Sequence, residues 1–219
     1  MDSRRDFLEA VKAGDLESLK EMIEEDVSLL GARTELGVSA ILLAIYYGKN
    51  ETAEYLSGES PQLDVFEASA AGRLERVRDL LAGEGDLANA YSSDGFQPLG
   101  LASFFGHPPV VELLLGHGAA VNSASRNSQH VMPLHGAVAH RHTEIARRLI
   151  EHGADVNAEQ EGGFTPLQEA AHSGQLEMAQ LLLDHGANVS SRNAAGKSAL
   201  DLALEQDHKN VARILRQSP

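Results

Sequence analysis

The chain has 219 residues, of which 42% are hydrophobic and 23% charged, as in an ordinary folded protein. It has no cysteine, which excludes disulfides, thiolate nucleophiles and cysteine-bound metal centres, and no stretch approaches the 18 apolar residues of a membrane span. The net charge is −14, and most of the acidic excess lies before residue 126. This charge disfavours nucleic-acid binding. It keeps an extended surface soluble or, alternatively, attracts a basic protein partner.

The first 60 residues contain two pairs of short amphipathic segments, 3–33 and 34–60. The first pair carries acidic residues along its second segment, which is typical of a terminal unit that faces water. In the second pair, Ser39 offers a hydroxyl that can cap a helix. The N-terminus has no apolar signal core. The absence of targeting signals and of long insertions favours a cytoplasmic, bacterial-type protein.

A glycine between the two segments of each pair marks a repeat. Gly48 lies 34 residues after Gly14, but Gly72 follows only 24 residues later. The remaining intervals are 34, 35, 33 and 33, through Gly106, Arg141, Gly174 and Asp207. These intervals predict a single array of seven units, at about 3–33, 34–60, 61–91, 92–126, 127–159, 160–192 and 193–217. About ten residues are missing near 57–63, which predicts a short turn in place of one loop.

The later units differ in how their first helix begins. Asp64 is a candidate N-cap in the third unit, whereas Gln97 and Met132 stand where the fourth and fifth units need a capping oxygen. The loss of a cap costs about 1 kcal/mol, so these two units should depend more on packing. The sixth unit is complete: Thr165 caps the first helix, Pro166 occupies its first turn, and Gly186 ends the second helix. The polar last helix predicts a C-terminal cap.

These motifs resemble the ankyrin repeat family. The matching segments are Met132-Pro133-Leu134-His135, Thr165-Pro166-Leu167, and LLLGHGAAVN (113–122), LIEHGADVN (149–157) and LLLDHGANVS (181–190). The resemblance implies an all-α solenoid of about seven helix-turn-helix units, with β-hairpin loops between units and a cap at each end. It also implies a role in binding other proteins.

The family's architecture places the last residues of each first helix on the concave face, together with the loop tips. In this chain those positions hold Tyr46, Tyr47, Phe104, Phe105, His140 and His172, and the apolar tips are Phe96 and Phe164. Exposed aromatic residues on a rigid surface are typical anchors of protein interfaces. These eight residues are therefore the candidate partner-binding site. The alternative is that their rings pack locally against neighbouring units.

Histidine is abundant, but its spacing does not favour a metal. His117, His152 and His185 recur at repeat spacing, too far apart to share one ion, and they are better explained as helix C-caps. A patch formed by His140 and His172 is a further candidate. No catalytic motif is present in the sequence.

The sequence therefore predicts a non-catalytic, monomeric scaffold without cofactor or metal, which binds a protein of unknown identity. A regulatory or inhibitory subunit, held in a stable complex with an enzyme, is the alternative.

Overall fold

The computed structural model describes residues 3–60, 62–83 and 85–218, and these residues form 14 α-helices arranged in seven antiparallel pairs. The first helices of the pairs are α1 (Ser3–Ala13), α3 (Ala40–Tyr46), α5 (Val65–Ala70), α7 (Pro98–Phe105), α9 (Pro133–Ala139), α11 (Pro166–His172) and α13 (Ala199–Glu205). The second helices are α2 (Leu16–Glu25), α4 (Asn50–Glu59), α6 (Leu74–Gly83), α8 (Pro108–Gly116), α10 (Thr143–Glu151), α12 (Leu176–Asp184) and α14 (Lys209–Gln217).

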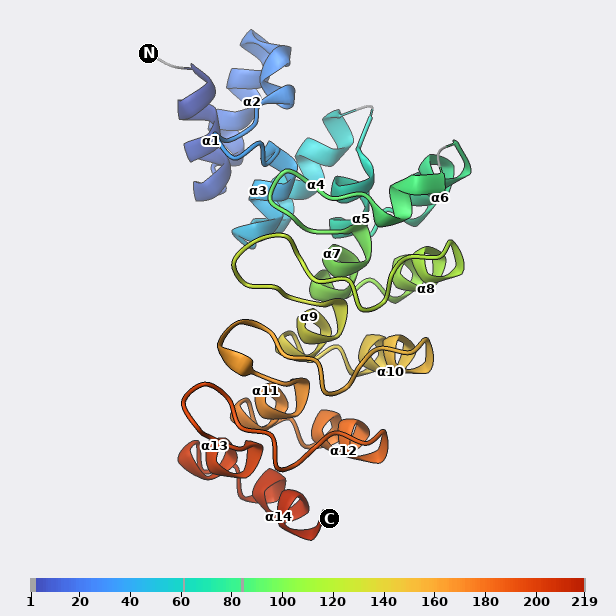
Figure 1. Ribbon diagram of the computed structural model, residues 1–219. Helices are drawn as coiled ribbons and strands as arrows, with labels where there is room; N and C mark the ends of the chain where they lie inside the picture. The colour runs from blue at the N-terminus through green and yellow to red at the C-terminus, as the bar shows by residue number, and fades with distance from the viewer. Residues whose placement is uncertain (1–2, 61, 84, 219) are drawn as a thin grey trace.

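The pairs stack in chain order, with the two termini at opposite ends of the stack (Figure 1). Each first helix contacts the next first helix from α1 to α13, and a parallel run of contacts joins the second helices from α6 to α14. The buried apolar residues form one stripe along the whole stack, from Phe7 to Leu215. The arrangement is a solenoid, because a single pair has too little apolar surface to be stable alone.

The loops between pairs are closed by turns rather than by strands. Among the described residues only two isolated β-bridges occur, Arg33 with Ser39 and Gln160 with Phe164. The sequence led us to expect β-hairpins, and the loops do reverse direction, as the bond from the Ser92 amide to the Phe96 carbonyl shows. The two bridges do not extend into a ladder among the described residues. Short 3-10 turns precede two of the loops, at Val27–Gly31 and Gly85–Asn89, and a third, Glu161–Gly163, lies between the bridged residues Gln160 and Phe164.

Helix capping follows the sequence closely. The side chains of Ser39, Asp64 and Thr165 each accept a hydrogen bond from the first turn of the helix that follows. Gln97 and Met132 make no such bond, as predicted. The predicted C-caps are also confirmed. In His117, His152 and His185 the ring Nδ1 lies 2.8 Å from the carbonyl oxygen four residues earlier.

The repeated glycine slot has a left-handed backbone in all seven units. The φ angle is +78° at Gly14 and +68° at Gly174, and it remains positive where the slot holds Arg141 (+63°) or Asp207 (+58°). A side chain costs about 1–2 kcal/mol in this conformation, which explains the preference for glycine.

The residue after the slot ties neighbouring repeats together. His107 Nε2 lies 2.8 Å from the Ala70 carbonyl, and His142 Nε2 lies 3.1 Å from that of Phe104. His208 makes the same contact with His172 of the preceding unit at 3.0 Å. The imidazole lies directly over the glycine of that unit: a Cβ on Gly106 would come within 2.5 Å of the His142 ring. We call each such contact a rung.

Asparagines join successive loops on the other side of the stack. Asn122 Nδ2 donates to the Gly153 carbonyl at 2.9 Å, and its Oδ1 accepts from the Asp155 amide at 2.9 Å. Asn89 and Asn157 make the same pair of bonds with the following repeat. Each asparagine therefore satisfies one backbone donor and one backbone acceptor of the next repeat.

The regular stacking is interrupted between the second and third pairs. Only residues 60–64 connect α4 with α5, in the position of a full loop elsewhere, and Pro61 lies outside the described residues. The rung is changed here as well. Arg73, which follows the slot of the third unit, pairs with Glu54 of α4 at 2.5 Å. A Cβ on Gly48 would meet nothing within 4 Å.

Candidate functional site

Four of the predicted side chains form a continuous cluster of rings at the C-terminal ends of α3, α7 and α9. Tyr46 stacks on Phe105, with ring centroids 5.9 Å apart and an interplanar angle of 17°. Phe105 meets Phe104 edge to face at 4.8 Å, and Phe104 lies 3.8 Å from the His140 ring. Such geometries stabilise aromatic pairs by about 0.5–1.5 kcal/mol beyond burial alone.

A cavity of about 260 Å³ opens beside these rings. Its walls are Tyr46, Phe96, Gly100, Leu101, Phe104, Phe105 and Gln129. Gly100 adds no side chain to this lining, and a Cβ there would meet no atom within 4 Å; Gln129 is the one residue of the lining with a side-chain amide. We call this the aromatic cavity. Its size and apolar walls suit one large hydrophobic side chain.

A hydrogen bond to the neighbouring loop holds Tyr46 in place. Its hydroxyl donates to Asp94 Oδ2 at 2.7 Å, and Ser92 Oγ donates to the other carboxylate oxygen at 2.5 Å. Partial burial raises the pKa of the Tyr46 hydroxyl, and the hydrogen bond to the Asp94 carboxylate raises it further. Tyr46 is therefore a neutral donor with a set orientation. Tyr47, which is 54% exposed, makes no such side-chain hydrogen bond within the described part of the chain.

The short connection near residue 60 explains why rings from the second and fourth units meet. Without a full loop in the third unit, the loop at 33–39 contacts the loop at 91–97 directly. A Cβ on Gly37 would lie 2.9 Å from Cβ of Ser93. The third unit contributes only Ala70 and Ala71 at the ring positions, and Ala70 is buried. Tyr46 and Phe105 can therefore stack across it.

The predicted site is thus only partly assembled. Tyr46, Phe96, Phe104, Phe105 and His140 gather around the aromatic cavity. Three other candidates lie elsewhere.

Tyr47, beside Tyr46, does not line the aromatic cavity. The Phe164 ring lies beside Gly162 of the same loop. The Phe164 carbonyl oxygen is 3.3 Å from His135 Nε2. His172 is exposed, and its carbonyl oxygen accepts the hydrogen bond from the His208 ring. The patch of His140 and His172 stays a prediction; the His140 ring lies against Phe104, and its centroid is 6.2 Å from that of the His142 ring.

A second hollow continues from the aromatic cavity along the loop tips. It measures about 770 Å³ and is lined by Leu36, residues 91–96 and residues 126–129. Phe96 and Gln129 border both spaces. Arg126 lies over the Tyr91 ring, with its guanidinium carbon 3.7 Å from the centroid. Leu36 is 76% exposed at the tip. Together the two hollows form a groove across the second, fourth and fifth units.

Sequence reasoning missed Asp94, Gln129 and Leu36, which complete the groove. Asp94 and Leu36 each stand in a turn directly before a left-handed glycine, Gly95 and Gly37. That local signal places them at loop tips, but the contact between these two loops depends on the omitted loop. No group of three or more metal-ligating side chains occurs in the described ranges.

Comparison with known proteins agrees with the repeat pattern. A family model for ankyrin repeats in three copies matches residues 65–160, and a second, for many copies, matches 149–203. Ankyrin repeat protein nuc-2 of Neurospora crassa is 30% identical over 183 residues, which cover 78% of this chain and 17% of that protein. Ankyrin repeat and SAM domain-containing protein 6 of Rattus norvegicus is 34% identical over 108 residues, covering 49% and 12%.

A third relative is a transient receptor potential cation channel subfamily A member 1 homolog of Caenorhabditis elegans. It is 31% identical over 155 residues, which cover 71% of this chain and 13% of the relative. The chain thus spans less than a fifth of the length of each of these three proteins. No helix in the described part of the chain is both long and apolar enough to cross a membrane.

Proposed function

Because the chain belongs to the ankyrin repeat family, whose repeats are generally protein–protein interaction modules, we propose that it is a non-catalytic scaffold that holds a protein partner on its concave face and loop tips. The observation that carries this proposal is the aromatic cavity. It is an apolar hollow, walled by Tyr46, Phe96, Phe104 and Phe105, on a surface built from rigid helices.

The partner inserts one large apolar side chain into the aromatic cavity. Burial of a Leu, Met or Phe side chain is worth about 1.5–3 kcal/mol, enough to make this contact a hot spot. The surrounding rings are already stacked, and Tyr46 is held by Asp94. Little side-chain entropy is therefore lost when the partner binds.

The rest of the partner lies along the groove past Phe96 and Gln129. The net charge of −14 favours a partner that is basic outside its apolar anchor. The charge acts mainly on the association rate, so binding should slow as salt is raised while the apolar anchor retains its contribution. We propose that the scaffold itself is a monomer.

The test is affinity capture from the source cells, followed by binding measurements with the purified partner. Phe104→Ala and Tyr46→Ala each remove a wall of the aromatic cavity and should weaken partner binding by about tenfold or more. Tyr55→Ala is the matched control, because it removes an aromatic ring on α4 that lies against Lys20 and outside the groove. If Tyr55→Ala weakens binding as much as the other two, or if none does, the proposed surface is wrong.

A further inference from the structure

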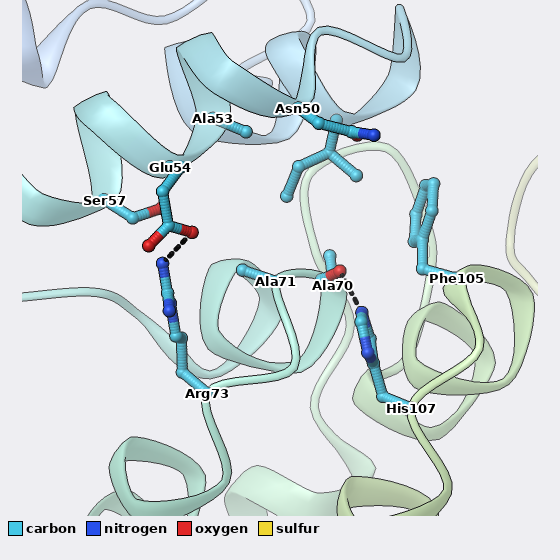
Figure 2. A pocket seen from close by; sticks show the side chains of 10 residues that line it. Asn50, Ala53, Glu54, Ser57, Ala70, Ala71, Arg73, Phe105 and His107 are labelled. Carbon is cyan, nitrogen blue, oxygen red and sulfur yellow. Dashed lines mark hydrogen bonds and ion pairs between the residues drawn. The ribbon is translucent and has the colours of Figure 1, made fainter.

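A further cavity lies where the regular stacking is interrupted, between the second, third and fourth units. It has a volume of about 340 Å³, within the range of small-ligand sites. Residues from three successive units line it, mainly on α4, at the end of α5 and at the end of α7. Figure 2 shows Ser57, Glu54 and Arg73 at one end and Phe105 at the other. We call it the wedge cavity.

The wedge cavity lies at the step where the rung is altered. In the other units named above, an imidazole covers the glycine of the preceding repeat. Here Arg73 turns instead to Glu54, so nothing occupies the space over Gly48 within 4 Å. The next rung, from His107 to Ala70, is intact and forms one wall. The cavity therefore coincides with both the omitted loop and the changed rung.

The two ends of the wedge cavity differ in chemistry. Ile45, Ala53, Ala70, Ala71 and Phe105 form the apolar part. The opposite end contains two hydrogen-bonding side chains, Ser57 and Arg73, beside Glu54. The buried Ser57 hydroxyl has no partner among the described residues, although a helical serine ordinarily bonds a carbonyl of the preceding turn. The Arg73 guanidinium carries five N–H groups, and its Nη2 donates to the Glu54 carboxylate.

We propose that the wedge cavity binds a small organic carboxylic acid with an aromatic or branched apolar body. The body lies against Ile45, Ala70 and Phe105. The carboxylate accepts hydrogen bonds from Ser57 and Arg73, which satisfies the orphaned hydroxyl and forms a charge-assisted contact with the guanidinium.

Glu54 would be displaced from Arg73 when such a ligand binds. Its side chain is 72% exposed, so it can turn into water at little cost. The Arg73 side chain is only 36% exposed and remains in the cavity wall. Burial lowers the pKa of His107, so its ring is neutral at pH 7 and adds no charge to the site. The ligand therefore competes with one internal carboxylate.

Because the ligand competes with Glu54 for Arg73, the proposal predicts which ligands bind and which substitutions tighten or weaken that binding. Phenylacetate is titrated into the full chain at 150 mM salt, and the amide signals of residues around the wedge cavity are followed by NMR. The dissociation constant of so small a ligand should be on the order of millimolar. Phenylacetamide, its neutral counterpart, and acetate, which lacks the apolar body, should each bind at least about tenfold more weakly.

Variants then assign the roles. Arg73→Gln should weaken phenylacetate binding by about tenfold, and Ser57→Ala by a smaller factor. Glu54→Gln should tighten binding by about two- to fivefold, because it frees Arg73. Glu51→Gln is the matched control: it removes the same charge from the exposed first turn of α4, outside the cavity, and should change binding little.

The outcomes are separable from the protein-binding proposal, because none of these variants alters the aromatic cavity. Phe105 is left unchanged, since it lines both spaces. Three results would each overturn the inference: no saturable shift at the cavity amides, equal affinity for phenylacetamide, or tighter binding in Glu51→Gln as well as Glu54→Gln. Circular dichroism of each variant establishes that the array is folded.

Discussion

The glycine slot allows the rung contacts to be measured with a matched pair of substitutions, Gly48→Ala and Gly106→Ala. Both positions have a left-handed backbone, with φ of +65° and +82°. Their surroundings differ. A Cβ at Gly48 meets no atom within 4 Å, whereas a Cβ at Gly106 would lie 2.5 Å from Cε1 of the His142 ring. The difference between the two variants therefore isolates the rung.

The expected costs follow from the geometry. A side chain in the left-handed region costs about 1–2 kcal/mol, and alanine recovers about 0.4–1 kcal/mol through the less flexible unfolded chain. Gly48→Ala should thus destabilise the fold by about 1 kcal/mol. In Gly106→Ala the His142 ring must also move away from the Phe104 carbonyl, and a lost hydrogen bond adds about 0.5–1.5 kcal/mol. The total should be about 2 kcal/mol.

Urea titrations followed by circular dichroism measure both variants, with His142→Ala and the double variant Gly106→Ala/His142→Ala alongside. Removal of the His142 ring relieves the clash with the new Cβ. In the His142→Ala background, Gly106→Ala should therefore cost only about 1 kcal/mol, the same as Gly48→Ala costs in the native chain. If Gly48→Ala and Gly106→Ala cost the same, the rung contributes nothing and the reasoning fails.

Three further outcomes are expected. Asn157→Ala removes the two bonds that reach the following loop and should cost about 2 kcal/mol in urea titration, whereas Asn188→Ala, which removes only a local bond from the Ser190 amide, should cost less; equal losses would refute the interlocking role. Met132→Thr supplies the hydroxyl that α9 lacks, so the thermal midpoint should rise by an amount equivalent to about 1 kcal/mol; a decrease would show that the Met132 side chain matters more for packing. Burial lowers the pKa of His135, so the unfolded chain binds the proton more tightly; stability is present above about pH 6.5 and falls as the pH drops below it. Urea midpoints at pH 7.5 and 5.5 measure this loss, which should shrink in His135→Asn and which would be absent if the folded and unfolded pKa values were equal.

Local features of the molecule could be predicted from the sequence because they depend on residues within one turn of each other. The caps at Ser39, Asp64 and Thr165 involve atoms two or three residues apart. The histidine C-caps reach back four residues. The left-handed slot is a backbone preference of a single residue, and Arg141 and Asp207 could be assigned to it by their place in the period alone.

The candidate site was predicted only in outline. Position in the repeat brought Tyr46, Phe104, Phe105 and His140 to one face, and all four do meet there. The same rule included His172, which lies outside that ring network. Whether neighbouring rings touch depends on the distance and curvature between units, which periodicity does not specify.

The sequence by itself determined the repeat, its helix pairs and the single step at which a loop is missing, because these follow from hydrophobic spacing and backbone conformation. Only the tertiary structure decided what that step produces. It brings Tyr46 against Phe105 across a unit that offers only alanines, and it leaves the space over Gly48 open while Arg73 turns to Glu54. Both results depend on side chains from three units that meet only when the units are stacked, so no local pattern encodes them.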